Sequence, residues 1–364
     1  MAHIRRHPTT GKPQVRWIDP WRREKSRTFD KMKDARAFMA EVEVAIRSGE
    51  YLDPKRASIS LGEWSLAWLR SRVGVRPNTK TRDEATLRNH VLPELGHLRL
   101  SDIGFEHVQT FVEMMNTKGL APATVLKAHQ VLALMLDFAV KSRRIGWNPA
   151  RGVELPPAGD SPARFISGTD IDHLAETIDP YHRLLVMLGG YCGLRWGEAA
   201  GLHLEQVDLL HKRITIDRTL VEVGGQFHTG PPKTKASRRQ VSLPSFMVID
   251  IDRHLGVYPV GRDGLITASA SGTFLRRSNF SRRVWTPAVD VAGLSPLRYH
   301  DLRHSHVALL IAQGEHPKLI ADRLGHASPT VTMSIYAHLF PGLDEEAAER
   351  MEKARRTSDG LHGN

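Results

Sequence analysis

The chain has 364 residues, enough for two or three domains, since single hydrophobic cores usually stop growing below this length. Its 41% hydrophobic and 25% charged content excludes a largely disordered chain. The 51 Lys and Arg residues against 40 Asp and Glu give a formal net charge of +11, a balance typical of nucleic-acid binding.

The basic excess is concentrated at the start of the chain. Residues 1–27 carry eight basic side chains against two acidic ones, a net charge of +6. From this stretch we predict six DNA-binding residues: Arg5, Arg6, Arg16, Arg22, Arg23 and Lys25. The single cysteine, Cys192, excludes an intrachain disulfide and indicates a reducing compartment. With no apolar run of 18 residues, we expect a cytoplasmic protein without membrane contact.

Residues 1–58 are predicted to form a small sheet-plus-helix module. Residues 14–19 alternate in polarity between turn residues, which favours short strands over 1–29. Apolar positions at helical spacing then predict a helix over about 32–47.

Residues 59–150 are predicted to form an all-helical domain. Four amphipathic stretches, bounded by Gly and Pro, predict helices near 61–72, 79–94, 105–118 and 122–143. A linker is expected at 148–159, because its X-Pro steps and glycines cannot continue a helix.

Residues 151–364 are predicted to form a third, mixed domain. Strands are expected at 213–217 and 240–243, with a turn at Gly224-Gly225 between them. Helices are expected near 170–178, 182–190, 196–207, 246–255, 278–292, 300–313, 317–324, 328–338 and 344–356. The whole chain is therefore predicted to be mainly α with small β-sheets, an α+β protein.

Three short clusters in this domain carry side chains suited to phosphate chemistry. They are Gly193–Glu198 around Arg195, the run His300–His306 with Arg303, and Leu324–Pro329 with His326, ten positions before Tyr336. A weaker feature is a basic hairpin predicted at 232–239. Alone, each has an ordinary structural interpretation, such as a surface ion pair or a packed tyrosine.

In combination, the order of these residues resembles the tyrosine recombinases of the phage integrase type. The family pattern of Arg, hairpin Lys, His-x-x-Arg, His and Tyr is matched here by the catalytic candidates Arg195, Lys233, His300, Arg303, His326 and Tyr336. Lys235 fits the hairpin position as well as Lys233 does, and we prefer Lys233. If Lys233 is the catalytic lysine, Lys235 is a DNA-binding candidate.

The resemblance also implies domain roles and partners. It implies that 1–58 binds arm-type DNA sites, that 59–150 binds core-type sites, and that 151–364 is catalytic. It further implies a homotetramer on double-stranded DNA in a bacterial host, near the nucleoid, with a host DNA-bending factor as a further partner. The stretch 344–351 would then pack on a neighbouring protomer. Viral genome integration is the expected process.

Physical chemistry gives these residues coherent roles. Arginines can grip a phosphate bidentately, so Arg195 and Arg303 are expected to stabilise the charge that develops in the transition state. A tyrosine hydroxyl needs help to lose its proton, and His300 is the candidate base on the family analogy. Lys233 would protonate the leaving oxygen. Glu198, one turn beyond Arg195, is expected to orient its neighbours without touching DNA. No metal or cofactor is expected.

Three alternatives stay open at this point. His300 and His304 stand four positions apart, which partly matches the zinc helix of metallohydrolases, although Asp301 is shorter than the Glu that pattern uses. A DNA-binding factor without catalysis would share the basic N-terminus. A type IB topoisomerase would share the catalytic residue types. The arm-like module favours the integrase.

Overall fold

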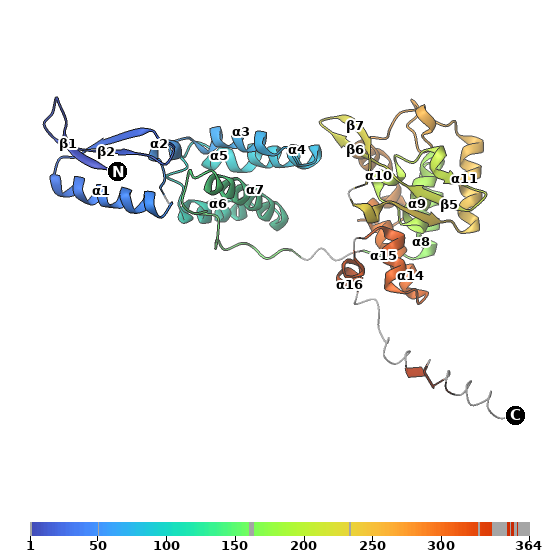
Figure 1. Cartoon of the computed structure of the whole chain (residues 1–364). Helices are drawn as coiled ribbons and strands as arrows, with labels where there is room; N and C mark the ends of the chain where they lie inside the picture. The colour runs from blue at the N-terminus through green and yellow to red at the C-terminus, as the bar shows by residue number, and fades with distance from the viewer. Residues whose placement is uncertain are drawn as a thin grey trace. The chain divides into compact units, whose positions relative to one another are not determined.

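The computed structural model describes residues 2–49, 51–159, 164–232, 234–326, 328–336, 348–349, 351–352 and 355. The chain divides into two compact units, residues 1–160 and 161–364, and each is described by itself (Figure 1). Both combine helices with small antiparallel sheets, which confirms the predicted α+β class.

A three-stranded antiparallel sheet covered by one helix opens the first unit. The strands pair in chain order and are β1 (His3–Arg6), β2 (Pro13–Ile18) and β3 (Glu24–Thr28). Helix α1 (Met32–Arg47) lies along one face of this sheet (Figure 1). Val15 and Trp17 are buried on that face, two residues apart as strand geometry requires. The Trp17 indole also donates to the Tyr51 hydroxyl at 2.8 Å.

The rest of the first unit is helical, as expected. Its helices are α2 (Pro54–Ala57), α3 (Leu61–Ser71), α4 (Pro77–Thr86), α5 (Leu92–Leu95), α6 (Phe105–Thr117) and α7 (Pro122–Lys141). A π-helical stretch, Leu87–Val91, joins α4 to α5, so the helix predicted at 79–94 is continuous but irregular. By length and composition α7 could cross a membrane. Its residues Val125, Leu132 and Leu136 are buried in the core of this domain, which accounts for the apolar composition.

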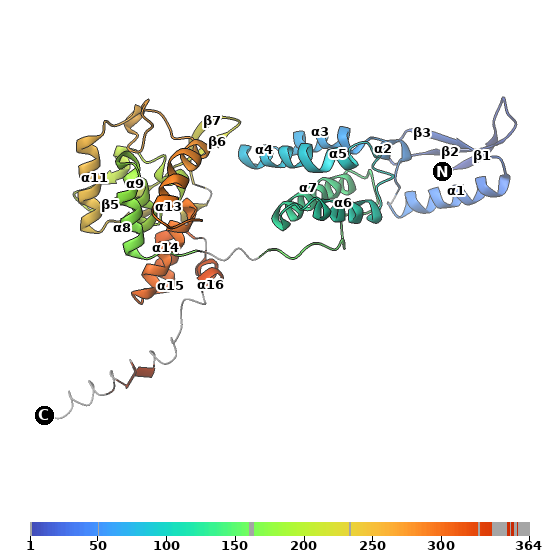
Figure 2. The ribbon, with the colours of Figure 1, turned by 180° about the vertical axis from the view of Figure 1, so that it is seen from behind.

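The second unit is built around the buried helix α9. Its helices are α8 (Gly168–Thr177), α9 (Arg183–Cys192), α10 (Trp196–Ala199), α11 (Ser245–Val257), α12 (Arg277–Phe280), α13 (Thr286–Val291), α14 (Tyr299–Ala312), α15 (Pro317–Leu324) and α16 (Pro329–Tyr336). Helix α14 packs along α9, where the Tyr299 hydroxyl donates to the Leu185 carbonyl at 3.0 Å. Helix α13 packs on α8 (Figure 2). This packing places α14, which carries the His-x-x-Arg run, against the helix that leads to Arg195.

Two small sheets and several short helical turns complete this unit. One sheet has the order β4 (Val207–Asp208), β5 (Arg213–Ile216), β8 (Arg239–Ser242), and the other pairs β6 (Thr219–Val223) with β7 (Gln226–Gly230). The short 3₁₀ turns are Pro180–His182, Leu204–Gln206, Lys235–Ser237 and Arg262–Gly264, and a π-helical stretch spans Ser281–Trp285.

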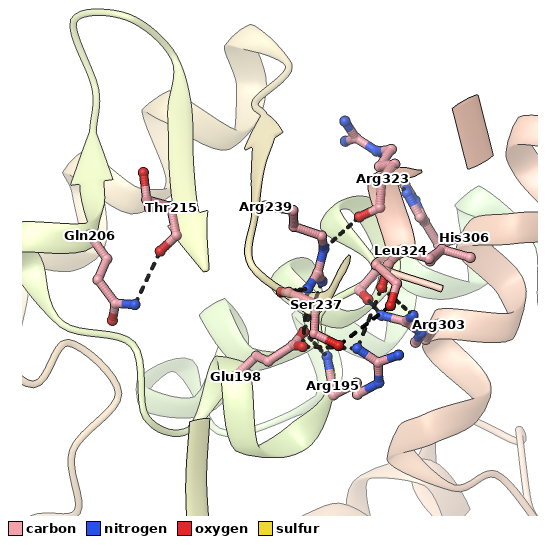
Figure 3. A network of polar contacts seen from close by, with 12 residues as sticks. Arg195, Glu198, Gln206, Thr215, Ser237, Arg239, Arg303, His306, Arg323 and Leu324 are labelled. Atoms are coloured by element: carbon pink, nitrogen blue, oxygen red, sulfur yellow. Dashed lines mark hydrogen bonds and ion pairs between the residues drawn. The ribbon is translucent and has the colours of Figure 1, made fainter. Parts of the chain in front are cut away.

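Two local predictions in this unit are wrong. The helix predicted at 196–207 ends at Ala199, because Gly197 and Gly201 lie against Leu220 of β6, and a Cβ at Gly197 would lie 2.4 Å from the Leu220 carbonyl oxygen. Gln206 then bonds to the Thr215 carbonyl at 3.1 Å and fixes a turn there (Figure 3). The segment 232–239 is not a hairpin, since β7 pairs with β6 while β8 pairs with β5. It connects two different sheets.

Candidate active site

The two predicted arginines converge on one backbone oxygen. Arg195 precedes α10 and Arg303 lies in α14, and both guanidinium groups donate to the Leu324 carbonyl at the end of α15, at 3.4 and 2.6 Å (Figure 3). Arg303 also donates to the Gly193 carbonyl at 2.7 Å. Burial and the nearby charge of Arg195 lower the pKa of Arg303 to about 9, so this buried group stays charged at neutral pH.

Buried Glu198 ties Arg195 to a further arginine. Its carboxylate accepts from the Arg195 backbone N–H and guanidinium, both at 3.0 Å, and from the Arg239 guanidinium at 2.9 and 3.1 Å. Burial opposes ionisation, but the hydrogen bonds and charge of Arg239, with Arg195, lower the pKa of Glu198 to about 2. Arg239 also donates from Nε to the Arg323 carbonyl at 2.7 Å. Sequence reasoning missed Arg239, although it is half of the visible Arg238-Arg239 pair.

Glycines at two positions allow these arginines to reach their acceptors. Gly193 ends α9 at a φ of 64°, and a Cβ there would lie 2.6 Å from the His306 ring. Gly325 ends α15 at a φ of 66°. The last carbonyls of a helix have no partner within it, and here the Arg323 and Leu324 carbonyls receive arginine donors instead.

The two predicted catalytic histidines are neutral at pH 7. Burial, followed by His304, lowers the pKa of His300 to about 4. Burial, followed by Arg303 and Arg195, lowers the pKa of His326 to about 4. A neutral imidazole offers one ring N–H donor and one acceptor nitrogen, which suits a hydrogen bond to phosphate or the uptake of a proton.

Tyr336 is buried at the end of α16, with its hydroxyl on a histidine. Its side chain is 2% exposed, and its oxygen lies 2.5 Å from Nδ1 of His304. The ring packs with Leu324 and Phe165. Burial raises the pKa of Tyr336 to about 12, against a smaller lowering by Arg303. In the described part of the chain it is thus His304, and not the predicted base His300, that bonds to Tyr336. His304 is the last residue of the His-Asp-Leu-Arg-His run at 300–304, so the sequence offered it as a second candidate.

Some predicted residues lie outside the described part. Lys233 is one of them, and of Lys235 only the backbone, in the turn Lys235–Ser237, is described. The choice between these lysines therefore stays a prediction. Most of the stretch 344–351 also lies outside the described residues. Within the described ranges, no group of three His, Cys, Asp or Glu side chains is arranged to hold a metal.

The basic residues of the N-terminal sheet do not all share one environment. Arg5 and Arg16 belong to the sheet face opposite α1, since Arg5 pairs with Gln14 and side chains alternate along β2. The loop residues Arg22 and Arg23 and the strand-end Arg6 are exposed. Lys25 instead bonds to buried Asp53 at 2.6 Å. Burial opposes ionisation of Asp53, but Lys25 and the Lys55 backbone keep its pKa below the usual range.

Comparison with known proteins decides the family. Residues 164–342 match the Phage integrase family, and residues 60–116 match the phage integrase N-terminal SAM-like domain. The chain belongs to the phage integrase family. It is therefore a site-specific tyrosine recombinase, an enzyme that breaks and rejoins DNA, as the sequence predicted. The topoisomerase and inactive-factor alternatives are not favoured.

Similar integrases span most of the chain. The ICEBs1 integrase of Bacillus subtilis (strain 168) is 27% identical over 292 residues, covering 77% of this chain and 79% of that protein. The Tn1549 transposon integrase, solved with a circular intermediate DNA, matches with a TM-score of 0.70 at 20% identity, covering 82% of this chain and all of that one. A lambda integrase tetramer bound to a Holliday junction matches with a TM-score of 0.56 at 18% identity, covering 90% and 92%.

Proposed function

We propose that this integrase cleaves DNA with Tyr336 at a phosphate held by Arg195 and Arg303. The observation that carries the proposal is the convergence of both guanidinium groups on the Leu324 carbonyl oxygen. Two cations that donate to one oxygen can also donate to one phosphate group, whose negative charge binds them more strongly than a neutral carbonyl does. Preorganised cations of this kind stabilise the charge that builds on phosphate oxygens during attack.

The remaining candidates supply proton transfer and further contacts. His326, neutral and close to the arginines, is proposed to donate a hydrogen bond to the scissile phosphate. His300, whose ring lies edge-on to that of His304 on α14, is proposed to lie near the same phosphate as the base expected from the sequence. Lys233, with Lys235 as the alternative, is proposed to protonate the leaving 5′ oxygen. Glu198 is proposed to fix the direction of Arg195 through the bonds described above.

The reaction conserves the phosphodiester energy. The Tyr336 oxygen forms a bond to phosphorus, the bond from phosphorus to the 5′ oxygen breaks, and a 3′-phosphotyrosyl intermediate results. Attack by a 5′ hydroxyl of the partner strand reverses these steps and joins the new strands. Integration or excision at attachment sites follows from two such exchanges.

The direct test is covalent trapping. The full chain, mixed with candidate attachment-site DNA and EDTA, should form an adduct that survives SDS. The Tyr336→Phe variant lacks only the hydroxyl, so it should bind the same DNA without forming the adduct. An adduct formed by the Phe variant would move the assignment to another nucleophile, with Tyr299 examined first.

The assembly on DNA is also proposed. Residues 1–58 would bind arm-type sites, 59–150 core-type sites, and 151–364 would carry the chemistry. The lambda integrase similarity supports a homotetramer, since that structure is a tetramer on a Holliday junction. A bacterial cytoplasm, association with the nucleoid and a host DNA-bending factor complete the proposal. Sedimentation with attachment-site DNA tests the stoichiometry, and DNA relaxation without strand exchange would instead favour a topoisomerase.

A further inference from the structure

The contact between His304 and Tyr336 places a potential base on the nucleophile itself. Nδ1 of His304 lies 2.5 Å from the Tyr336 oxygen, at the short end of the range for a hydrogen bond. The two ring centroids lie 5.7 Å apart. The two residues are 32 positions apart in the sequence, so the contact arises from tertiary packing, in which α16 lies against α15.

We propose that His304, in place of His300, takes the proton of Tyr336 in the cleavage step. This inference rests on the proposed function, in which Tyr336 is the nucleophile. As the tyrosine oxygen bonds to phosphorus, its proton passes to Nδ1, and His304 becomes an imidazolium. The bond to the 5′ oxygen breaks, and that oxygen receives its proton from the lysine of the 232–239 segment. Rejoining returns the His304 proton to the tyrosine oxygen.

The surroundings of His304 suit a proton acceptor. Burial lowers the pKa of His304. Asp301 raises it by less, and Arg298 and Arg303 lower it further, so the imidazole is neutral at pH 7. A neutral ring with its hydrogen on Nε2 leaves Nδ1 free to accept from the tyrosine hydroxyl.

The ring of His300 stacks edge-on at 4.8 Å, one helical turn away on the same face of α14. At this distance a charge on His304 lowers the pKa of His300. The guanidinium of the neighbouring Arg303 points elsewhere, to Gly193 and Leu324. Helix α14 therefore presents phosphate-binding and proton-accepting groups in different directions.

The same contact could instead only hold Tyr336 away from DNA, and that role predicts the opposite effect on the cleavage rate. Tyr336 is 2% exposed, and its ring packs among apolar residues. If His304 only held the tyrosine away from DNA, removing the imidazole would release it and speed cleavage. If His304 takes the proton, removing the imidazole slows cleavage. The sign of the effect separates the two roles.

The test measures single-turnover formation of the covalent adduct by the full chain on nicked attachment-site DNA. His304→Asn keeps a hydrogen-bond acceptor near the position of Nδ1 but cannot take the proton, so adduct formation should slow by about a hundredfold or more. The matched control is His173→Asn, an exposed histidine of α8 in the same unit, which should react at the wild-type rate. Imidazole added to His304→Ala should restore part of the rate.

A second substrate isolates the proton that is transferred. A 5′-bridging phosphorothiolate has a thiolate leaving group that departs without protonation, so it should restore cleavage by Lys233→Ala. It should leave the His304→Asn defect in place, because the tyrosine must still lose its proton. A wild-type or faster rate for His304→Asn, or its restoration by the phosphorothiolate, would overturn the inference. An adduct with Tyr336→Phe would overturn the proposed function instead.

Discussion

Replacing Glu198 by Gln should destabilise residues 161–364 by about 3 kcal/mol at neutral pH. The carboxylate is 3% exposed and accepts four hydrogen bonds from Arg195 and Arg239. Glutamine keeps the size of the side chain but removes the charge and two acceptor positions. Arg239, whose side chain is 5% exposed, then keeps a buried charge without its partner.

Two estimates of this magnitude agree. Lowering the pKa of Glu198 from 4.5 to about 2 corresponds to roughly 3 kcal/mol, since each pKa unit is worth about 1.4 kcal/mol. Breaking a buried ion pair by removing one partner typically costs about 3–5 kcal/mol. For a unit of this size, about 3 kcal/mol lowers Tm by roughly 6–12 °C.

The pH dependence gives the sharper measurement. The folded pKa lies below the ordinary value, so this stabilisation is present above about pH 4.5 and is lost as the pH falls toward 2. Scanning calorimetry of the full chain at several pH values should show the difference between wild type and Glu198→Gln shrinking over that window. The transition of residues 1–160 serves as the internal control. A difference that stays constant from pH 6 to pH 3 would refute the reasoning.

Three further changes test other parts of the molecule. Arg303→Lys keeps the charge but loses the planar fork, so adduct formation should slow by about a hundredfold, or roughly 3 kcal/mol. EDTA should leave the wild type active, and loss of activity in EDTA with rescue by zinc would support a metallohydrolase. Deleting residues 1–58 should abolish arm-site binding. The logarithm of its binding constant should fall against the logarithm of salt concentration with a slope of about −3.6, if about four phosphates are neutralised. Displacement of the isolated 1–58 fragment by unrelated duplex as readily as by specific duplex would contradict site-specific binding. Gly193→Ala should lower the Tm of the 161–364 unit, because its left-handed backbone costs an L residue about 1–2 kcal/mol and the new Cβ would meet the His306 ring; an unchanged Tm would show that this turn relaxes freely.

Helices with local start and stop signals were predictable from the sequence. For α15 the sequence places His316 before Pro317 and Gly325 after Leu324, and the observed bounds match the prediction. The end of α10 was not predictable, because Gly197 and Gly201 acquire meaning only when β6 lies against them. Tertiary packing overrode a local helical pattern there.

The site shows the same division between local pattern and packing. Arg195, Arg303 and Tyr336 were predicted from their order in the chain and its resemblance to the family pattern, and the structure brings the two arginines to a common acceptor. The partner of Tyr336 was not found, because His300 and His304 lie on one face of α14 and spacing alone cannot rank them. Only the position of α16 selects His304. Arg239 was missed for the same reason, since Glu198 is distant from it in sequence.

The carbonyl end of α15 links the arginines to the nucleophile. The Arg323 carbonyl accepts from Arg239, and the Leu324 carbonyl accepts from Arg195 and Arg303. His326 follows this end directly, and α16 with Tyr336 comes next. In the proposed function a DNA phosphate would compete with the Leu324 carbonyl for the same donors, because charge-assisted bonds to phosphate are the stronger. If the proposed function holds, binding of the scissile phosphate acts on the segment that leads to Tyr336. The two arginines proposed to stabilise the transition state would then also sense the substrate.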